Sequence, residues 1–193
     1  MKYLTFIFIF LLYHTAFAEF QIITLQPDLV TTQIGDPITL TVQYDVSNGD
    51  STLQGIGIAV HFDSDKLHIA QTDISNLFSI GLAGVPLIRE EGDNENDHNE
   101  KTDKVIIFFW SYFFGGNWPN QKLPLELAHL RFTVNKKYGN TAINITPTTL
   151  SNGYEFQGTS SQINILKIKG DINSDGILNI KDLLSLLNLI GKI

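Results

Sequence analysis

Hydrophobic and polar residues alternate in short segments over residues 20–168, and turn-forming residues separate these segments. Residues 38–44 alternate with a period of two, which is typical of a strand with one face in a core. Residues 55–62 also place their apolar side chains on one face. A turn signal, Ser47-Asn48-Gly49-Asp50, lies between these two segments. The pattern therefore predicts β-strands joined by short connections.

Two stretches depart from this simple alternation. Residues 105–114 are almost continuously apolar and aromatic, which favours a central strand covered on both faces. Residues 90–103 are polar and acidic, and they predict a loop longer than a usual hairpin connection. Further strands are predicted at residues 66–70, 127–134, 141–145 and 163–168. Many short strands without helical patterns between them indicate a mainly β protein with an antiparallel β-sandwich.

Helical periodicity occurs only near the C-terminus. The apolar residues there follow an i, i+3, i+4, i+7, i+10 spacing: Ile180, Leu183, Leu184, Leu187 and Ile190. Gly191 follows as a helix stop signal. No proline- or serine-rich linker separates the last strand from this helix, so we expect the two parts to lie close together.

The first 18 residues resemble a secretory signal peptide. Lys2 supplies a positive charge, residues 3–13 are almost entirely apolar, and residues 16–18 read Ala-Phe-Ala. The alternative is a membrane anchor, but this run is shorter than the roughly 20 residues that span a bilayer. The sequence thus predicts a signal peptide at 1–18, a sandwich domain at 19–168 and a C-terminal segment at 169–193, with a secreted or periplasmic location.

Composition narrows the classes of function. The formal net charge is −7, and removal of Lys2 with the signal peptide makes it −8. An acidic surface disfavours nucleic acid and offers carboxylates to cations. The chain has no cysteine, which excludes thiol catalysis and cysteine-ligated zinc. An exported domain without disulfides depends on its core or on bound metal for stability.

Residues 171–182 have the spacing of an EF-hand-type calcium loop. Calcium prefers six to eight oxygen ligands, and Gly176 permits the sharp turn around the ion. The expected ligands are the side chains of Asp171, Asn173, Asp175, Asn179 and Asp182 and the backbone carbonyl of Ile177. The alternative is a polar turn in which Asn179 and Asp182 cap the helix. Capping alone does not require acids at positions 1 and 5 together with glycine at position 6, so we favour a Ca²⁺ site.

The same segment closely resembles one half of a dockerin module, through GDINSDG at 170–176 and NIKDLL at 179–184. Dockerins carry two such loop-helix segments in tandem, and this sequence contains one. The resemblance implies calcium binding and contact with a protein partner. Loop positions 10 and 11, which often contact the partner in dockerins, are Ile180 and Lys181 here.

Residues 25–168 resemble a cohesin-like domain, the jelly-roll sandwich that dockerins bind. The similar segments are IGDPITL at 34–40, GIGIAVHFDSDKL at 55–67 and LELAHLRFTV at 125–134. The resemblance implies a protein-binding module. Carbohydrate-binding modules share this architecture, so the fold alone leaves protein and glycan open as ligands.

The histidines and the acidic loop offer little other recognisable chemistry. His61, His68 and His129 lie in or beside predicted strands, where we expect surface or hydrogen-bonded positions. His98 lies in the acidic loop, where Asp93, Glu95 or Asp97 could hold a second cation; the alternative is a solvated loop.

Aromatic residues could instead form a platform for sugar stacking. Trp110 has apolar neighbours and is expected in the core, whereas Trp118 follows a glycine-rich turn and is the better candidate for an exposed position. No catalytic motif is recognisable, and we expect a chain that is not an enzyme.

These features predict an exported, non-catalytic binding or scaffolding module. The apolar stripe of the C-terminal helix needs a cover, either its own sandwich, as a structural clasp, or a protein partner. The short connection favours the sandwich. The alternative is a carbohydrate-binding module that accompanies polysaccharide degradation.

Overall fold

Strands make up most of the computed structural model, which describes residues 18–92, 97–112, 117–135 and 137–192. The strands are β1 (Glu19–Gln26), β2 (Leu29–Gln33), β3 (Pro37–Val46), β4 (Thr52–Leu53), β5 (Gly55–Phe62), β6 (Leu67–His68), β7 (Ile74–Asn76), β8 (Leu87–Glu90), β9 (Lys104–Ser111), β10 (Trp118–Pro119), β11 (Leu125–Val134), β12 (Gly139–Thr149), β13 (Tyr154–Thr159) and β14 (Ser161–Leu166). A 3-10 helix, η1 (Gln71–Asp73), precedes β7, and one α-helix, α1 (Ile180–Ile190), follows the strands. The predicted signal peptide falls almost wholly on residues 1–17, which lie outside the described residues.

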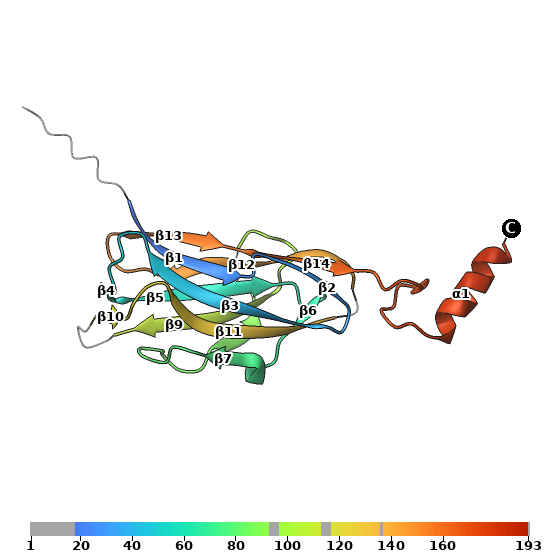
Figure 1. Cartoon of the computed structure of the whole chain (residues 1–193), viewed down its shortest axis with the longest axis horizontal. Coiled ribbons are helices and arrows are strands. Elements are labelled where there is room, and N and C mark those ends of the chain that lie inside the picture. The colour runs from blue at the N-terminus through green and yellow to red at the C-terminus, as the bar shows by residue number, and fades with distance from the viewer. Residues whose placement is uncertain (1–17, 93–96, 113–116, 136, 193) are drawn as a thin grey trace, which may run out of the picture.

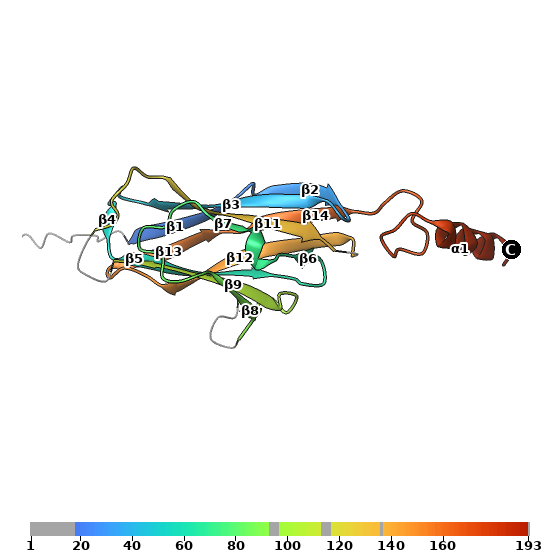
Figure 2. The ribbon, with the colours of Figure 1, turned by 90° about the horizontal axis from the view of Figure 1, so that it is seen from below.

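Two sheets pack face to face (Figure 1). One has the order β13-β1-β3-β11-β6, with β7 also paired to β11, and the other has the order β2-β14-β12-β5-β9-β8. The two layers are seen edge-on in Figure 2. The prediction of a mainly β sandwich is confirmed.

The first two strands of the sandwich domain pair with its last two strands. Strands β1 and β2 follow each other in sequence but belong to different sheets, and so do β13 and β14. The pairs β1–β13 and β2–β14 are parallel, because both segments cross between the sheets in the same direction. The prediction of antiparallel pairing holds for the inner strands and is wrong for these two pairs.

The core between the sheets is rich in large apolar side chains. The largest fully buried ones include Trp110, Trp118, Tyr44, Phe108 and Phe132. Phe108 and Trp110 stack with ring centroids 5.3 Å apart, and the Trp110 indole N–H donates to the carbonyl of Phe78 at 3.0 Å. Each buried indole thus keeps a hydrogen-bond partner, as burial of a polar group requires. The core assignment of Trp110 is confirmed.

Strand β5 is buried along its whole length. Its apolar residues face the core, and the opposite face carries Gly57, Ala59 and His61. A Cβ at Gly57 would lie 2.4 Å from Thr148 Oγ1 of β12 and 2.9 Å from Phe109 Cδ2 of β9, so side chains of the two neighbouring strands cover this position. The strand covered on both faces is therefore β5. Strand β9, for which the sequence predicted double cover, has half-buried residues on its outer face.

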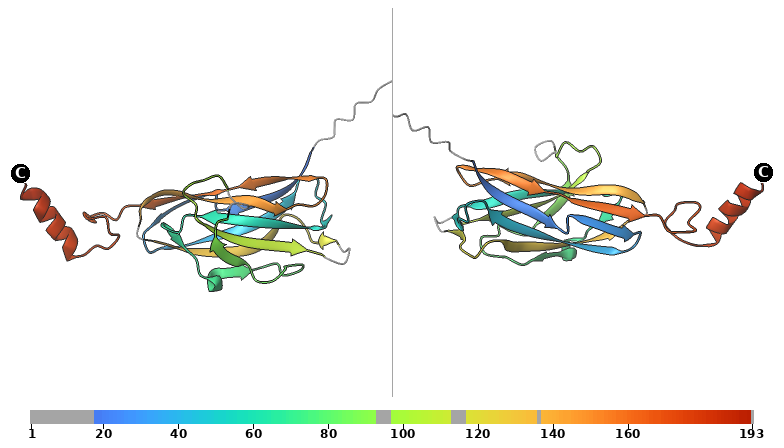
Figure 3. Two further views of the ribbon diagram at one scale, coloured as in Figure 1. Left: turned by 180° about the vertical axis from the view of Figure 1, so that it is seen from behind. Right: turned by 45° about the horizontal axis from the view of Figure 1, so that its top comes forward.

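The loop and helix after β14 lie beyond one end of the sandwich (Figure 1, Figure 2). Two further views show the same arrangement (Figure 3). Among the described residues, no helix is long and apolar enough to cross a membrane.

Candidate functional site

The predicted calcium loop begins with a buried carboxylate. Asp171 is only 1% exposed. One of its oxygens accepts a hydrogen bond from the backbone N–H of Asp175 at 3.2 Å, and the other accepts from that of Gly176 at 2.9 Å. Gly176 has φ of 79°, the left-handed region in which glycine carries no steric penalty. Asp171, the first residue of the loop, thus stabilises the turn at Asp175 and Gly176.

Asp182 closes the loop from the first turn of α1. Its Oδ1 accepts hydrogen bonds from the backbone N–H groups of Ile172 at 2.9 Å and Asn173 at 3.3 Å. Its Oδ2 accepts from the N–H of Asn179 at 2.8 Å. These bonds, that of Asn179 foremost, lower the pKa of Asp182. The start of the loop is therefore fastened to the start of the helix.

The remaining predicted ligands lie on the rim of the same loop. Asn173 Nδ2 donates to Asp175 Oδ2 at 2.9 Å, and Asn179 Nδ2 donates to the carbonyl of Ile177 at 3.2 Å. Asn179 Oδ1 accepts from the N–H of Lys181 at 2.8 Å, which caps the helix. The capping role considered from the sequence is thus present.

The donor set fits calcium chemically, because every ligand atom that the loop offers is an oxygen. Both Asp171 oxygens and Asp182 Oδ2 accept one backbone hydrogen bond each and keep a second lone pair for an ion, whereas Asp182 Oδ1 accepts two. The loop acids are not gathered as tightly as His61, Glu91 and Asp97, whose ligand atoms all lie within 4.8 Å of one another. Calcium binding therefore stays a prediction, and it would draw Asp171, Asp175 and Asp182 together.

The apolar side chains of α1 are exposed to solvent. The exposed residues of the loop and helix include Ile177, Leu178, Ile180, Leu183, Leu184, Leu186, Leu187, Leu189 and Ile190. Asp182 is the buried residue of the helix. The prediction that the sandwich covers this stripe is wrong. Residues 167–179, between β14 and α1, place the helix beyond the end of the sheets and do not fold it back onto them.

The aromatic platform expected for sugar stacking is absent at Trp118. This residue is fully buried, 4.8 Å from Tyr44 between ring centroids, and its indole N–H donates to the carbonyl of Ile80 at 2.9 Å. The prediction of an exposed Trp118 is wrong, because pairing of the short strands β10 and β4 brings this side chain into the core. The glycan-binding alternative loses the residue on which it depended.

The residues found around Asp97 differ from those predicted for a second cation site. Asp93 and Glu95 lie outside the described residues. Asp97 is described, and it lies beside His61 and Glu91, neither of which was predicted to belong to this site. A histidine on the outer face of an otherwise apolar strand was the available signal.

The comparisons with known proteins concern the sandwich. No family model matches the chain, and no curated protein matches it. Among solved structures, a type I cohesin–dockerin complex from Clostridium thermocellum is 14% identical, with a TM-score of 0.49 over 79% of this chain and 96% of that one. A cohesin module from a Clostridium perfringens family 33 glycoside hydrolase is 14% identical, with a TM-score of 0.48 over 75% and 96%. A type I cohesin from Pseudobacteroides cellulosolvens is 10% identical, with a TM-score of 0.43 over 78% and 94%.

Proposed function

We propose that this protein is an exported, non-catalytic assembly module. Calcium orders the loop at 171–182, and the loop presents α1 to a protein partner. The partner is the cohesin-like sandwich of a second copy of this chain. The observation that carries the proposal is the exposed apolar surface of α1 beyond the end of the sandwich.

The exposed apolar surface is large enough to drive association. Full burial of one Leu or Ile side chain contributes about 1.5–3 kcal/mol, and the apolar residues of α1 are on average about half exposed. Burial of the five stripe residues would therefore release roughly 4–7 kcal/mol before the costs of association. Such a surface favours a protein interface over solvent.

Calcium would add positive charge to a loop with a net negative charge. Three aspartates and one lysine, Lys181, lie within its twelve residues, and α1 depends on Asp182 for its N-terminal cap. An ion that neutralises these carboxylates stabilises the loop and, through Asp182, the start of the helix. Association should therefore depend on calcium.

A second copy is the proposed partner because the chain carries both resembling parts. The segment at 170–191 resembles half of a dockerin, and residues 25–168 resemble the domain that dockerins bind. Residues 167–179 separate β14 from α1 and place the helix beyond the end of its own sheets (Figure 1), which leaves it accessible to the sandwich of a neighbouring copy.

The experiment is a biosensor measurement with the protein both immobilised and in solution. We expect saturable binding in excess calcium and its loss in EGTA. Absence of binding in both buffers would refute the proposal. Because the sandwich is acidic, the measurement is repeated at high ionic strength as a control against binding through surface charge. Binding through apolar contacts should persist there.

A further inference from the structure

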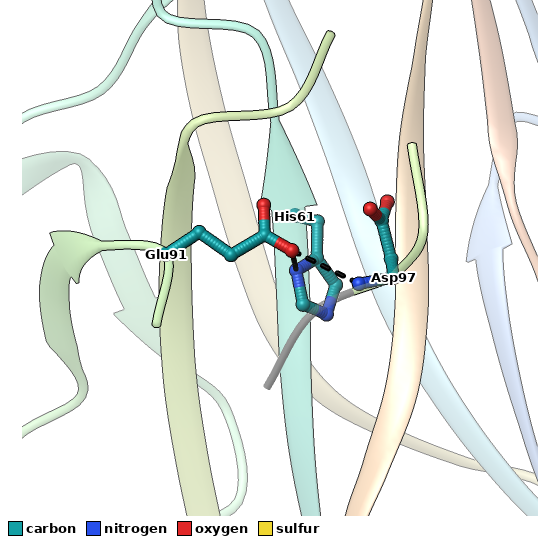
Figure 4. Close-up of side chains that lie close together, drawn as sticks. All are labelled: His61, Glu91 and Asp97. Carbon is teal, nitrogen blue, oxygen red and sulfur yellow. Dashed lines mark hydrogen bonds and ion pairs between the residues drawn. The ribbon is translucent and has the colours of Figure 1, made fainter. Parts of the chain in front are cut away.

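A second group of ligand-type side chains lies on the outer face of the sheet that contains β5. His61 projects from β5, Glu91 follows β8, and Asp97 belongs to the acidic loop at 91–103 (Figure 4). The three side chains come from different elements, and their ligand atoms lie within 4.8 Å of one another. The group lies on the sandwich, away from the calcium loop.

Two polar atoms of this group are buried without a hydrogen-bond partner. His61 is fully buried, and the Glu91 side chain is 7% exposed. Neither His61 Nδ1 nor Glu91 Oε2 has a hydrogen-bond partner in the described chain. Glu91 Oε1 lies 3.2 Å from Nδ1, but not in a direction that makes a hydrogen bond. A buried polar atom left in this state costs free energy that native proteins rarely accept.

The other ring nitrogen of His61 is already occupied. His61 Nε2 lies 2.8 Å from Thr146 Oγ1. When Nε2 donates to this hydroxyl, Nδ1 bears a lone pair that faces the Glu91 carboxylate. In this tautomer two electron-rich atoms face each other in a buried place, and a cation bound between them would remove their repulsion.

Asp97 is held in position by hydrogen bonds to its carboxylate. Oδ1 accepts from Thr102 Oγ1 at 2.8 Å and from the N–H of Asn99 at 2.9 Å, and Oδ2 accepts from Asn144 Nδ2 at 2.6 Å. The Asp97 N–H donates to Glu91 Oε1 at 2.9 Å. Partners of this kind behind a ligand are what metal sites use to orient their first ligands.

We propose that His61, Glu91 and Asp97 bind one divalent transition-metal ion of the zinc class. An imidazole nitrogen with two carboxylates suits zinc, whereas calcium and magnesium prefer oxygen ligands alone. Ligands about 2.0 Å from a tetrahedral zinc are about 3.3 Å apart. His61 Nδ1 and Glu91 Oε1 already have this spacing, at 3.2 Å, and Asp97, whose ligand atom lies within 4.8 Å of both, would have to approach by at most about 1.5 Å. The ion ties Glu91 and Asp97 to His61 of β5, and its role is structural.

The test is calorimetric titration of ZnCl₂ into the purified, tag-free protein at neutral pH with calcium in large excess. Calcium occupies the C-terminal loop and leaves zinc to the sandwich. We expect one zinc ion per chain, and we expect Glu91→Gln to weaken binding at least tenfold. His61→Gln should do the same, and circular dichroism reports whether that buried substitution still folds.

His129→Gln is the matched control. This histidine lies 3.9 Å from Glu126 on the surface, so it tests whether any exposed histidine–glutamate pair accounts for the signal. Zinc affinity should be unchanged in this variant. The proposal is overturned if the wild-type protein shows no saturable zinc binding, or if Glu91→Gln binds zinc as tightly as the wild type. If His61→Gln does not fold, Glu91→Gln decides alone.

Discussion

Replacing Leu187 with serine should weaken calcium-dependent association about tenfold. Leu187 lies in the middle of the apolar stripe of α1, with Leu183 and Leu184 one turn before it. Its residue surface is 54% exposed in the isolated chain. Full burial of a leucine contributes about 1.5–3 kcal/mol, so covering the exposed half contributes about 1–1.5 kcal/mol, which corresponds to roughly tenfold in Kd.

The matched control is Leu189→Ser, which makes the same chemical change on the same helix. Leu189 is 62% exposed, and it lies about 200° around the helix axis from Leu187. Both substitutions lower helix propensity equally, so a difference between them reports the interface and not the stability of the helix. We expect the control to change the Kd less than about twofold, within the range of surface substitutions.

The assay is the biosensor titration in calcium, with helix content checked by circular dichroism. Equal weakening by the two variants would show that only helix stability matters. No weakening by Leu187→Ser would show that this face is not the contact, and the reasoning would be refuted.

Calcium should raise the melting temperature of the helix signal at 222 nm, and Asp171→Ala combined with Asp175→Ala should abolish that rise; an identical curve in EGTA would contradict calcium binding. Acid should fray the helix, because the pKa of Asp182 lies below the ordinary value of 3.8, so its stabilisation is complete at neutral pH and is lost as the pH falls through the lowered pKa. Asp182→Asn should remove this acid transition when helicity is followed against pH. Trp118→Ala should destabilise the sandwich by about 3–5 kcal/mol in urea unfolding, because it empties a fully buried site, whereas exposed Tyr112→Ala should have little effect.

Alternation along the chain predicted much of the sandwich, because period-two patterns record which face of a strand is buried. The segment at 55–62 was predicted with the bounds that β5 has. The cover on its outer face was not predicted. At His61 that cover comes from Glu91 and Asp97, and at Gly57 it comes from side chains of the neighbouring strands, all of them distant in sequence. The alternation of β5 reports only the apolar face.

The sequence pattern also did not predict where the chain passes from one sheet to the other. Nothing in the sequence of residues 154–166 shows that β13 and β14 belong to different sheets and do not form a hairpin within one sheet. The parallel pairing of β1 with β13 depends on where the chain crosses between sheets, which is a property of the whole fold. Trp118 was misplaced for a similar reason, since its burial depends on a two-residue pairing with β4.

The two candidate metal sites also differ in how far the sequence could predict them. Residues 171–182 are contiguous, so spacing alone was enough to predict the loop, and in the structure Asp171 and Asp182 each accept hydrogen bonds from backbone N–H groups of that loop. The group of His61, Glu91 and Asp97 is built from three separate elements, and no spacing in the sequence connects them. The position of α1 depends on the short connection after β14, from which we had expected contact with the sandwich.

Sedimentation velocity of the whole exported chain, in excess calcium and in EGTA, tests the central claim most directly. We predict a species larger than the monomer in calcium and a monomer in EGTA. A monomer in both buffers would contradict the claim that calcium lets α1 join one copy to another.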